Sequence, residues 1–480
     1  MKVGFYVCDI TPAVSMEQPG GYGKAYIHGI HDALSVRAAV IDDGRERVAL
    51  VGIDTCELQP AEVIMRARRA IEEQCGIPAD HVVIGASHTH NGGPFPGLFA
   101  DDFAAAPDLI RRLVQEYSPL ANRLYVDWVL GQIASAVCEA DRRREDALLS
   151  VGSGREDQAG VNRRFRMKNG RSYTHPGKGN PDILEPAGPI DPEVGVLAAW
   201  RPNGDLLGCI VNYACHGTTF GGSLVSADWI GYLDSTIRGA MRTTGPAVFL
   251  QGAAGDITQV DNQSRRENEF GERWSRYVGT RVAAEALKVL ATAERGELAP
   301  VRAIARTLAF ARRLPSPERL EQSRRIVEDG ISSGRTETTE WTFAKELILL
   351  DYLAQRQPEA LVEVQAIQVG PAVFLSNPSE YFCQWGLDIK RASPFPFTYV
   401  VELANGCSGY VPTEDAFLPS GGGYETVLTA YSSLTANAGR KIAETSVELA
   451  RSLSPGAILQ GPQVKTVGQP WSYGVLGPDV

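Results

Sequence analysis

Short apolar runs alternate with helical patterns along most of this 480-residue chain, and this alternation constrains its fold more than any other feature. Apolar runs bounded by turn residues are typical of strands, whereas apolar residues three and four positions apart are typical of helices. We therefore expect an α/β protein with mixed β-sheets flanked by helices. After a first strand at the N-terminus, the expected strands lie at Arg37–Ile41, Val48–Ile53, His81–Ala86, Val194–Trp200, Leu206–Tyr213, Ala247–Leu250, Leu361–Val369, Ala372–Leu375 and Phe397–Leu403.

Helical patterns separate and follow these strands. The segment 169–189 is rich in Gly, Pro and charged residues, and we expect it to be disordered or mobile. We expect residues 1–455 to form one domain and residues 456–480, which are rich in Gly and Pro, to form a C-terminal tail. The expected helices lie at about 60–75, 120–144, 265–293, 316–328, 339–355 and 430–453.

The charge balance and the apolar content exclude several classes of protein. The net charge is 47 − 57 = −10, which argues against nucleic acid as a partner, because nucleic-acid binding needs clustered Lys and Arg. No apolar stretch approaches the length of a membrane span, so we expect no stable membrane association. The N-terminal sequence MKVGFYVCDITP predicts a strand and not a secretion signal, and the eight scattered cysteines predict reduced thiols. We therefore expect a cytoplasmic protein; a homo-oligomer stays open.

Polar residues follow the expected strands at six places. In open α/β sheets, the carboxyl ends of strands are where functional sites assemble. One such placement means little, but six of them indicate a shared cleft. The residues are Asp54, His88, His216, Asp256, Glu380 and Tyr410.

Three of these strand-end residues could hold a metal ion. His88 and His90 stand two positions apart in His88-Thr89-His90, and residues with that spacing on a strand point to one face. His216 adds a second strand-end imidazole and Glu380 adds a carboxylate. Imidazole and carboxylate ligands favour Zn²⁺ over Ca²⁺ or Mg²⁺, which prefer shells made of oxygen alone. An HxH motif by itself is weak, and a buried histidine with structural hydrogen bonds remains the alternative.

Six sequence blocks, in the same order and at compatible spacing, resemble blocks of the neutral ceramidase family. They are GIH followed by VRAAV, GASHTHNGG, NYACHGT, FLQGAAGDIT, Pro378-Ser379-Glu380 and SGYVPTEDAF. The resemblance to the family's catalytic domain covers residues 1 to about 455. It implies a zinc ion held by His88, His216, Glu380 and Tyr410. Tyr410 as a ligand comes from the resemblance alone, and a cleft tyrosine that hydrogen-bonds elsewhere is the alternative.

The resemblance also implies four catalytic residues. His90 and Tyr424 match a histidine and a tyrosine beside the substrate's reacting group, and Arg163 in GVNRRF matches the arginine of an NRS block. Thr258 stands where the family carries a serine proposed to act in catalysis. A supporting histidine and a surface arginine remain the alternatives for His90 and Arg163.

These implications describe a zinc-dependent hydrolase that cleaves an amide (N-acyl) bond of a small molecule through a metal-activated water. An ester or lactone hydrolase with the same zinc site is the alternative, and a silent binding protein with this fold is a third hypothesis. Thr258 and Cys407 depart from the family's pattern. We also expect the family's C-terminal immunoglobulin-like domain to be missing. These departures predict a substrate other than long-chain ceramide.

Overall fold

Three mixed β-sheets form the body of the protein in the computed structural model, which describes residues 1–461 and 468–479. The first sheet has the order β5 (Val82–Ala86), β4 (Arg47–Ile53), β3 (Ser35–Asp42), β1 (Lys2–Asp9) and β6 (Glu145–Asp146). The second has the order β15 (Ala247–Gln251), β13 (Leu206–Tyr213), β12 (Glu193–Trp200) and β7 (Leu148–Arg155). The third has the order β17 (Val301–Ala311), β18 (Glu359–Val369), β19 (Ala372–Ser376) and β21 (Phe397–Val401).

The inner faces of the three sheets share one hydrophobic core. Leu50 and Val83 of the first sheet, Leu250 of the second, and Phe374 and Val401 of the third belong to it. Because both faces of β13 are covered, all eight of its residues are buried, and its sequence is almost continuously apolar. The strands are therefore fixed by burial on both sides, which is why an apolar run was enough to predict them.

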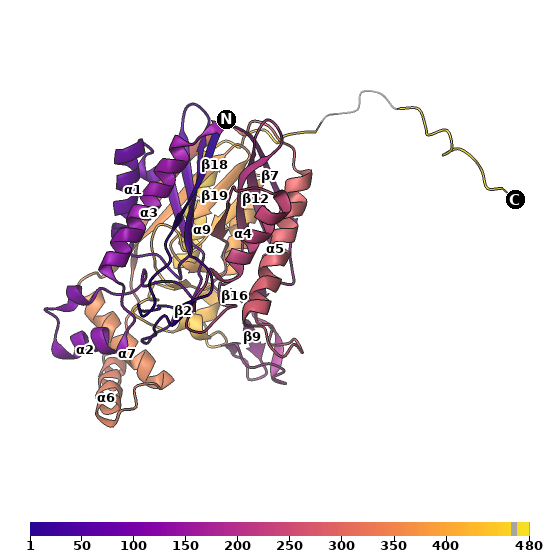
Figure 1. Cartoon of the computed structure of the whole chain (residues 1–480). Coiled ribbons are helices and arrows are strands. Elements are labelled where there is room, and N and C mark those ends of the chain that lie inside the picture. Colours follow the sequence, from indigo (N-terminus) through magenta and orange to yellow (C-terminus); the bar gives the residue numbers. More distant parts are fainter. Residues whose placement is uncertain (462–467, 480) are drawn as a thin grey trace.

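Pairs of helices cover the outer faces of the sheets. Helices α1 (Ala61–Cys75) and α3 (Arg123–Arg142) pack on the first sheet, and α4 (Asp228–Met241) and α5 (Glu272–Thr292) pack on the second. Helices α8 (Cys383–Ala392) and α9 (Ala438–Ser452) pack on the third. In Figure 1, α1 and α3 lie on one side of the strands and α4 and α5 lie on the other.

A helical unit with its own apolar core adjoins this body. It consists of α2 (Asp108–Tyr117), α6 (Pro317–Ser333) and α7 (Thr339–Ala354). Ser316 and Thr338 cap the two later helices, since each side chain accepts a backbone N–H of the first turn. Figure 1 shows this unit at the lower left, away from the strands of the three sheets.

Short ladders and turns join these parts. The two-stranded ladders are β14 (Leu224–Val225) with β2 (Gly29–Ile30), β16 (Ile257–Thr258) with β8 (Val161–Asn162), and β20 (Glu380–Tyr381) with β22 (Tyr410–Val411). A three-stranded sheet has the order β10 (Ser172–Thr174), β9 (Arg164–Met167) and β11 (Ile183–Pro186). The part of the chain that the structure describes also contains four 3-10 turns: η1 (Ala79–His81), η2 (Ala100–Phe103), η3 (Glu414–Phe417) and η4 (Tyr424–Thr426).

The α/β prediction is confirmed, and several local predictions are wrong. The helical zone at 120–144 begins only at Arg123, and the segment 169–189, expected to be disordered or mobile, contains β10 and β11. Helices α2, α4 and α8 and the strands β7 and β17 were missed. Both α4 and α8 contain glycine, which weakens a helical pattern, and both owe their burial to sheets formed by distant strands.

The structure also bears on the expectations about the cysteines, membrane spans and the domain boundary. All eight cysteines lie in the described part of the chain, and each is a free thiol. Within the described residues, no helix is both long enough and apolar enough to cross a membrane. The boundary near residue 455 stays a proposal: α9 ends at Ser452, but the amide of Gly456 still donates to the carbonyl of Gly370.

Candidate metal centre

His88, His216 and Glu380 meet at one buried point, although they lie far apart in the sequence. Their ligand atoms all lie within 4.8 Å of one another. Glu380 Oε2 is 3.2 Å from His88 Nε2 and 3.1 Å from His216 Nε2. The three side chains are at most 2% exposed. The structure therefore brings together the imidazoles and the carboxylate that the strand-end pattern selected.

Glycines permit this meeting because they let backbone segments approach closely. A Cβ at Gly217 would lie 2.7 Å from the carbonyl oxygen of His88, and a Cβ at Gly255 would lie 2.5 Å from the carbonyl oxygen of Glu380. Residue types with a side chain could not occupy these positions without shifting the neighbouring segment. His88 itself has a positive φ of 66°, so it leaves β5 through a turn and not as an extension of the strand.

The three side chains are only partly satisfied by hydrogen bonds. His88 Nδ1 lies 2.6 Å from the carbonyl oxygen of Cys56, which leaves Nε2 facing the cluster. Glu380 Oε1 accepts from the hydroxyl of Tyr431. Within the described residues, His216 Nδ1 and Glu380 Oε2 are buried without a hydrogen-bond partner of good geometry. Because unpaired buried polar atoms are costly, the donor set and its orphaned oxygen fit a cation.

The charges of the cluster follow from burial and proximity. Burial lowers the pKa of His216 well below its ordinary value, and Arg163 lowers it further, so this imidazole is neutral as a metal ligand must be. Burial opposes the charge on Glu380, but His88 and His216 hold the pKa of its carboxyl well below the usual range. Burial likewise opposes a charge on His88, and Glu380 raises its pKa.

Tyr410 lies beside Glu380 because the two residues are partners in the parallel ladder of β20 and β22. Tyr410 is 6% exposed, and the guanidinium carbon of Arg163 lies 5.4 Å from the centre of its ring. Burial raises the pKa of its hydroxyl well above the ordinary value, which Arg163 only partly offsets. Its place next to Glu380 is compatible with ligation and also with a hydrogen bond, so its role as a ligand remains a prediction.

His90 reaches the same cluster from the turn that carries His88. His90 Nε2 lies 3.5 Å from His88 Nε2, and His90 Nδ1 lies 2.9 Å from the carbonyl oxygen of Gly20. A carbonyl oxygen can only accept, so Nδ1 carries the proton and Nε2 presents a lone pair. Burial, with His88, lowers the pKa of His90 to about 3, which keeps the ring neutral.

Arg163 is buried against the cluster and held in place at three nitrogens. Its Nε donates to Glu425 Oε1 at 2.7 Å, its Nη2 donates to the carbonyl oxygen of Gly255 at 3.0 Å, and its Nη1 lies 3.1 Å from His216 Nε2. Burial opposes the charge, but Tyr410 and Glu425 raise the pKa of the guanidinium well above its ordinary value. A surface arginine, the alternative reading of this residue, does not match its 7% exposure.

Tyr424 and Thr258 occupy different positions relative to the cluster. The ring of Tyr424 lies 5.3 Å from that of Tyr410, and its hydroxyl lies 3.0 Å from the hydroxyl of Tyr22. Thr258 is 2% exposed, and its hydroxyl donates to Gln259 Oε1 at 2.9 Å. The two strand-end aspartates act structurally: Asp54 pairs with Arg37, and Asp256 accepts from the backbone N–H of Cys383 at the start of α8.

Four residues that contact the site were missed from the sequence. Tyr431 bonds Glu380, Glu425 holds Arg163, and Tyr22 meets Tyr424. Glu57 accepts from the thiol of Cys407, and burial and the nearby Glu380 raise its pKa to about 7. Glu57 had a sequence signal, since it follows the strand that ends at Ile53, and Glu425 stands next to Tyr424 in η4; Tyr22 and Tyr431 lie in loops without a pattern.

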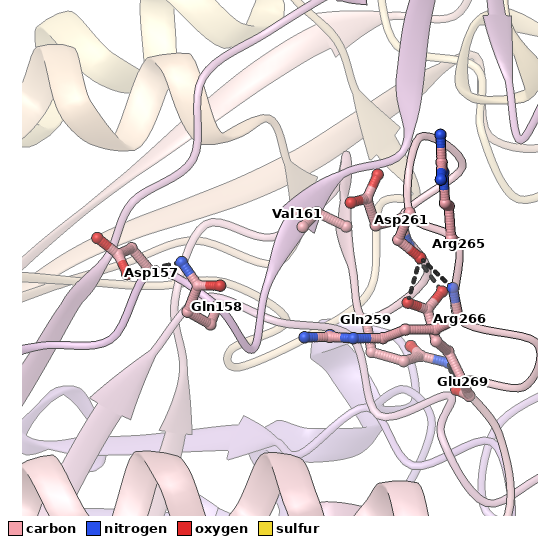
Figure 2. Close-up of a pocket in the computed structure, with 9 residues that line it drawn as sticks. Asp157, Gln158, Val161, Gln259, Asp261, Arg265, Arg266 and Glu269 are labelled. Atoms are coloured by element: carbon pink, nitrogen blue, oxygen red, sulfur yellow. Dashed lines mark hydrogen bonds between the residues drawn. The ribbon is translucent and has the colours of Figure 1, made fainter. Parts of the chain in front are cut away.

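Two other features of the structure have polar residues grouped together. Cys56, His88 and His90 form a second potential ligand group, but it shares His88 with the first. A polar hollow of about 500 Å³ lies between Asp157 and Gln158 on one side and the 259–269 loop on the other (Figure 2). None of its lining residues belongs to the His88, His216 and Glu380 cluster, so the hollow is not the metal centre.

The protein belongs to the α/β class, since helices cover its three mixed sheets. Two histidines and a glutamate form a buried cluster at the ends of its strands, and this cluster is a candidate metal centre. No family model matches the sequence. The chain is 24% identical, over 473 residues, to the neutral ceramidase of Pseudomonas aeruginosa, and the match spans 87% of this chain and 67% of that protein.

Solved structures agree with that match. A crystal structure of neutral ceramidase from Pseudomonas aeruginosa superposes with a TM-score of 0.69 at 20% identity, over 96% of this chain and 76% of the other. A ceramidase complexed with C2 gives the same TM-score and identity over 97% of this chain and 78% of the other. The chain is therefore neutral-ceramidase-like in fold, which confirms the resemblance drawn from its sequence blocks.

Proposed function

We propose that this protein is a zinc-dependent hydrolase that cleaves an amide (N-acyl) bond of a small-molecule substrate. The observation that carries the proposal is the convergence of His88, His216 and Glu380 within 4.8 Å in a buried cluster with an orphaned carboxylate oxygen. The similarity to neutral ceramidase supports the reaction type. An ester or lactone hydrolase with the same site is the second candidate, because the same polarised carbonyl chemistry acts on both bonds.

His88, His216 and Glu380 would hold the ion, with Tyr410 as the fourth residue in position to contribute. Zinc in such a site supplies a Lewis acid and an activated water at neutral pH. The other residues act on the substrate. Arg163 keeps its positive charge next to the cluster, where it stabilises negative charge that develops on the carbonyl oxygen.

We assign proton transfer and orientation of the substrate to His90 and Tyr424. The lone pair on His90 Nε2 faces the cluster and accepts a proton or a hydrogen bond there. The hydroxyl of Tyr424 hydrogen-bonds to the carbonyl oxygen or returns a proton to the leaving amine. Thr258 is assigned a supporting role, since its hydroxyl engages Gln259.

His216→Gln tests the metal centre, because glutamine preserves most of the volume and cannot ligate as imidazole does. We expect the metal content to fall from about one zinc per chain to near zero and turnover to fall about 1000-fold or more. Metal analysis, circular dichroism and a screen of amides, N-acyl sugars, esters, lactones and ceramides measure this. Chelation of the wild-type protein should produce the same loss, and zinc should restore activity. A folded variant that keeps its zinc and most of its rate would overturn the proposal.

Long-chain ceramide is expected to be a poor substrate. Thr258 replaces the family's serine and donates its hydroxyl to Gln259, and Cys407 occupies the place of a tyrosine and contacts Glu57. A ceramide specificity constant of about 10⁴ M⁻¹s⁻¹ or more would contradict this expectation. The cytoplasmic location and the homo-oligomer remain sequence-based hypotheses.

A further inference from the structure

Three aromatic rings lie together beside the candidate metal centre, and only the hydroxyl of one of them, Tyr424, has a role in the proposed reaction. The ring centres of Tyr22 and Phe343 are 5.7 Å apart, those of Tyr22 and Tyr424 are 6.3 Å apart, and those of Phe343 and Tyr424 are 6.5 Å apart. Tyr22 comes from the N-terminal loop, Phe343 from α7 and Tyr424 from η4. All three are partly exposed. We call them the aromatic wall.

The aromatic wall is connected to the candidate metal centre on two sides. The ring of Tyr424 lies 5.3 Å from the ring of Tyr410, which is the ladder partner of Glu380. The loop that carries Tyr22 also supplies the Gly20 carbonyl oxygen that accepts from His90. A molecule whose reacting carbonyl sits at the cluster therefore has its adjacent atoms within reach of the wall.

The chemistry of the wall favours an apolar ligand. The hydroxyls of Tyr22 and Tyr424 lie 3.0 Å apart, and one donates to the other, so only one hydroxyl proton of the pair is left for another acceptor. Phe343 contributes only carbon. Partly exposed aromatic surface gains free energy when an apolar group displaces water from it.

Lys345 fixes the wall in place. Its side chain is fully buried, and its ammonium donates to the carbonyl oxygen of Tyr22 at 2.6 Å and to that of Tyr117 at 3.0 Å. Glu346 accepts from the backbone N–H of Ala430 at 3.2 Å. A buried ammonium needs such acceptors, and each of them ties α7 to another segment. These contacts of α7 therefore fix the position of Phe343 relative to Tyr22.

We propose that Phe343, with Tyr22 and Tyr424, forms a subsite that binds the apolar acyl group of the substrate. This inference rests on the proposed function and adds the substrate class to it: an N-acyl compound with an aliphatic or aryl acyl group. The helical unit of α2, α6 and α7 then determines acyl selectivity, while the sheets supply the metal centre.

The test measures kcat/KM for N-acylethanolamines from acetyl to octanoyl, with amine release as the readout. In the wild-type protein we expect kcat/KM to rise about twofold to fourfold per methylene until the wall is covered. In Phe343→Ala this rise should flatten through a higher KM for the octanoyl compound. Calorimetric Kd values for ethyl- to octylphosphonate should show the same loss of chain-length dependence.

Ile331→Ala is the matched control, because Ile331 is partly buried against the core of the same helical unit and does not belong to the wall. It should lower the unit's stability and retain the chain-length dependence. A Phe343→Ala protein with the wild-type dependence in both assays would overturn the subsite. If the wild-type protein releases amine from none of these compounds while His216→Gln binds zinc normally, the proposed function itself fails. A chain-length effect on phosphonate binding alone would then still support the subsite.

Discussion

The candidate metal centre and the aromatic wall adjoin each other but are built in different ways. Ligand residues at the metal centre are at most 2% exposed, and their approach depends on backbone contacts at Gly217 and Gly255. The wall, by contrast, is partly exposed and depends on one buried lysine of an appended helical unit. The proposed catalytic residues therefore lie where backbone contacts constrain the fold most. The residues proposed to select the acyl group lie in the helical unit, which can change without disturbing the candidate metal centre.

Gly217→Ala should have the largest effect of these variants: it should disrupt the candidate metal centre and leave the aromatic wall intact. The added methyl would lie 2.7 Å from the carbonyl oxygen of His88, so the segments carrying His88 and His216 must separate. We expect zinc affinity to collapse and the free energy of unfolding to fall by about 1–3 kcal/mol. Metal titration and denaturant unfolding measure both. Gly131→Ala on α3 is the control, since nothing lies within 4 Å of its added methyl; there we expect unchanged zinc binding and equal or higher stability.

Glu425→Gln should separate metal binding from rate. Glu425 is fully buried and accepts from Arg163 Nε, so its loss frees the guanidinium that faces His216. We expect the zinc content to persist and kcat to fall about 10- to 100-fold, the range seen when a partner that orients site residues is removed. Glu414→Gln removes an exposed ion pair with Arg440 and serves as the comparison. Equal kcat in the two variants would show that Arg163 needs no such anchor.

Lys345→Met should loosen the wall while sparing the metal centre. The change removes three donated hydrogen bonds and leaves the carbonyl oxygens of Tyr22 and Tyr117 without their charged donor. We expect the free energy of unfolding to fall by about 1–3 kcal/mol, because buried acceptors without a partner cost about that much. Hydrogen exchange should increase in α7 and in the loop around Tyr22, with the zinc content unchanged. Faster exchange in β5 and β13 instead would mean that the two regions are one cooperative unit.

Ser316→Ala should give the smallest effect and bears on the helical unit alone. The side chain of Ser316 accepts the backbone N–H of Arg319 as the cap of α6. Its loss should cost about 1 kcal/mol of stability, read as a small decrease in Tm. Zinc content and kcat for the acetyl compound should not change. A decrease in either would contradict the separation of the two regions.

The sequence alone determined the α/β class, ten of the thirteen strands of the three main sheets (all but β6, β7 and β17) and the identity of the three ligand candidates. It could do so because strands buried on both faces are continuously apolar, and because a polar residue directly after such a run is visible in one dimension. Strand β13 was predicted at both ends, and the next polar strand-end residue, His216, lies in the cluster. Helices α4 and α8 were missed because their apolar faces have meaning only against sheets built from distant strands.

Only the tertiary structure decided which polar residues face one another. Asp54 and Asp256 follow strands just as His88 and Glu380 do, yet Asp54 pairs with Arg37 and Asp256 caps α8. Likewise, nothing local in the sequence places Phe343 of α7 beside Tyr424, which is 81 residues further along. The physical reason is that burial is encoded in the side chains of each segment. The pairing of segments, by contrast, depends on long-range packing and on close backbone approaches that no local pattern records.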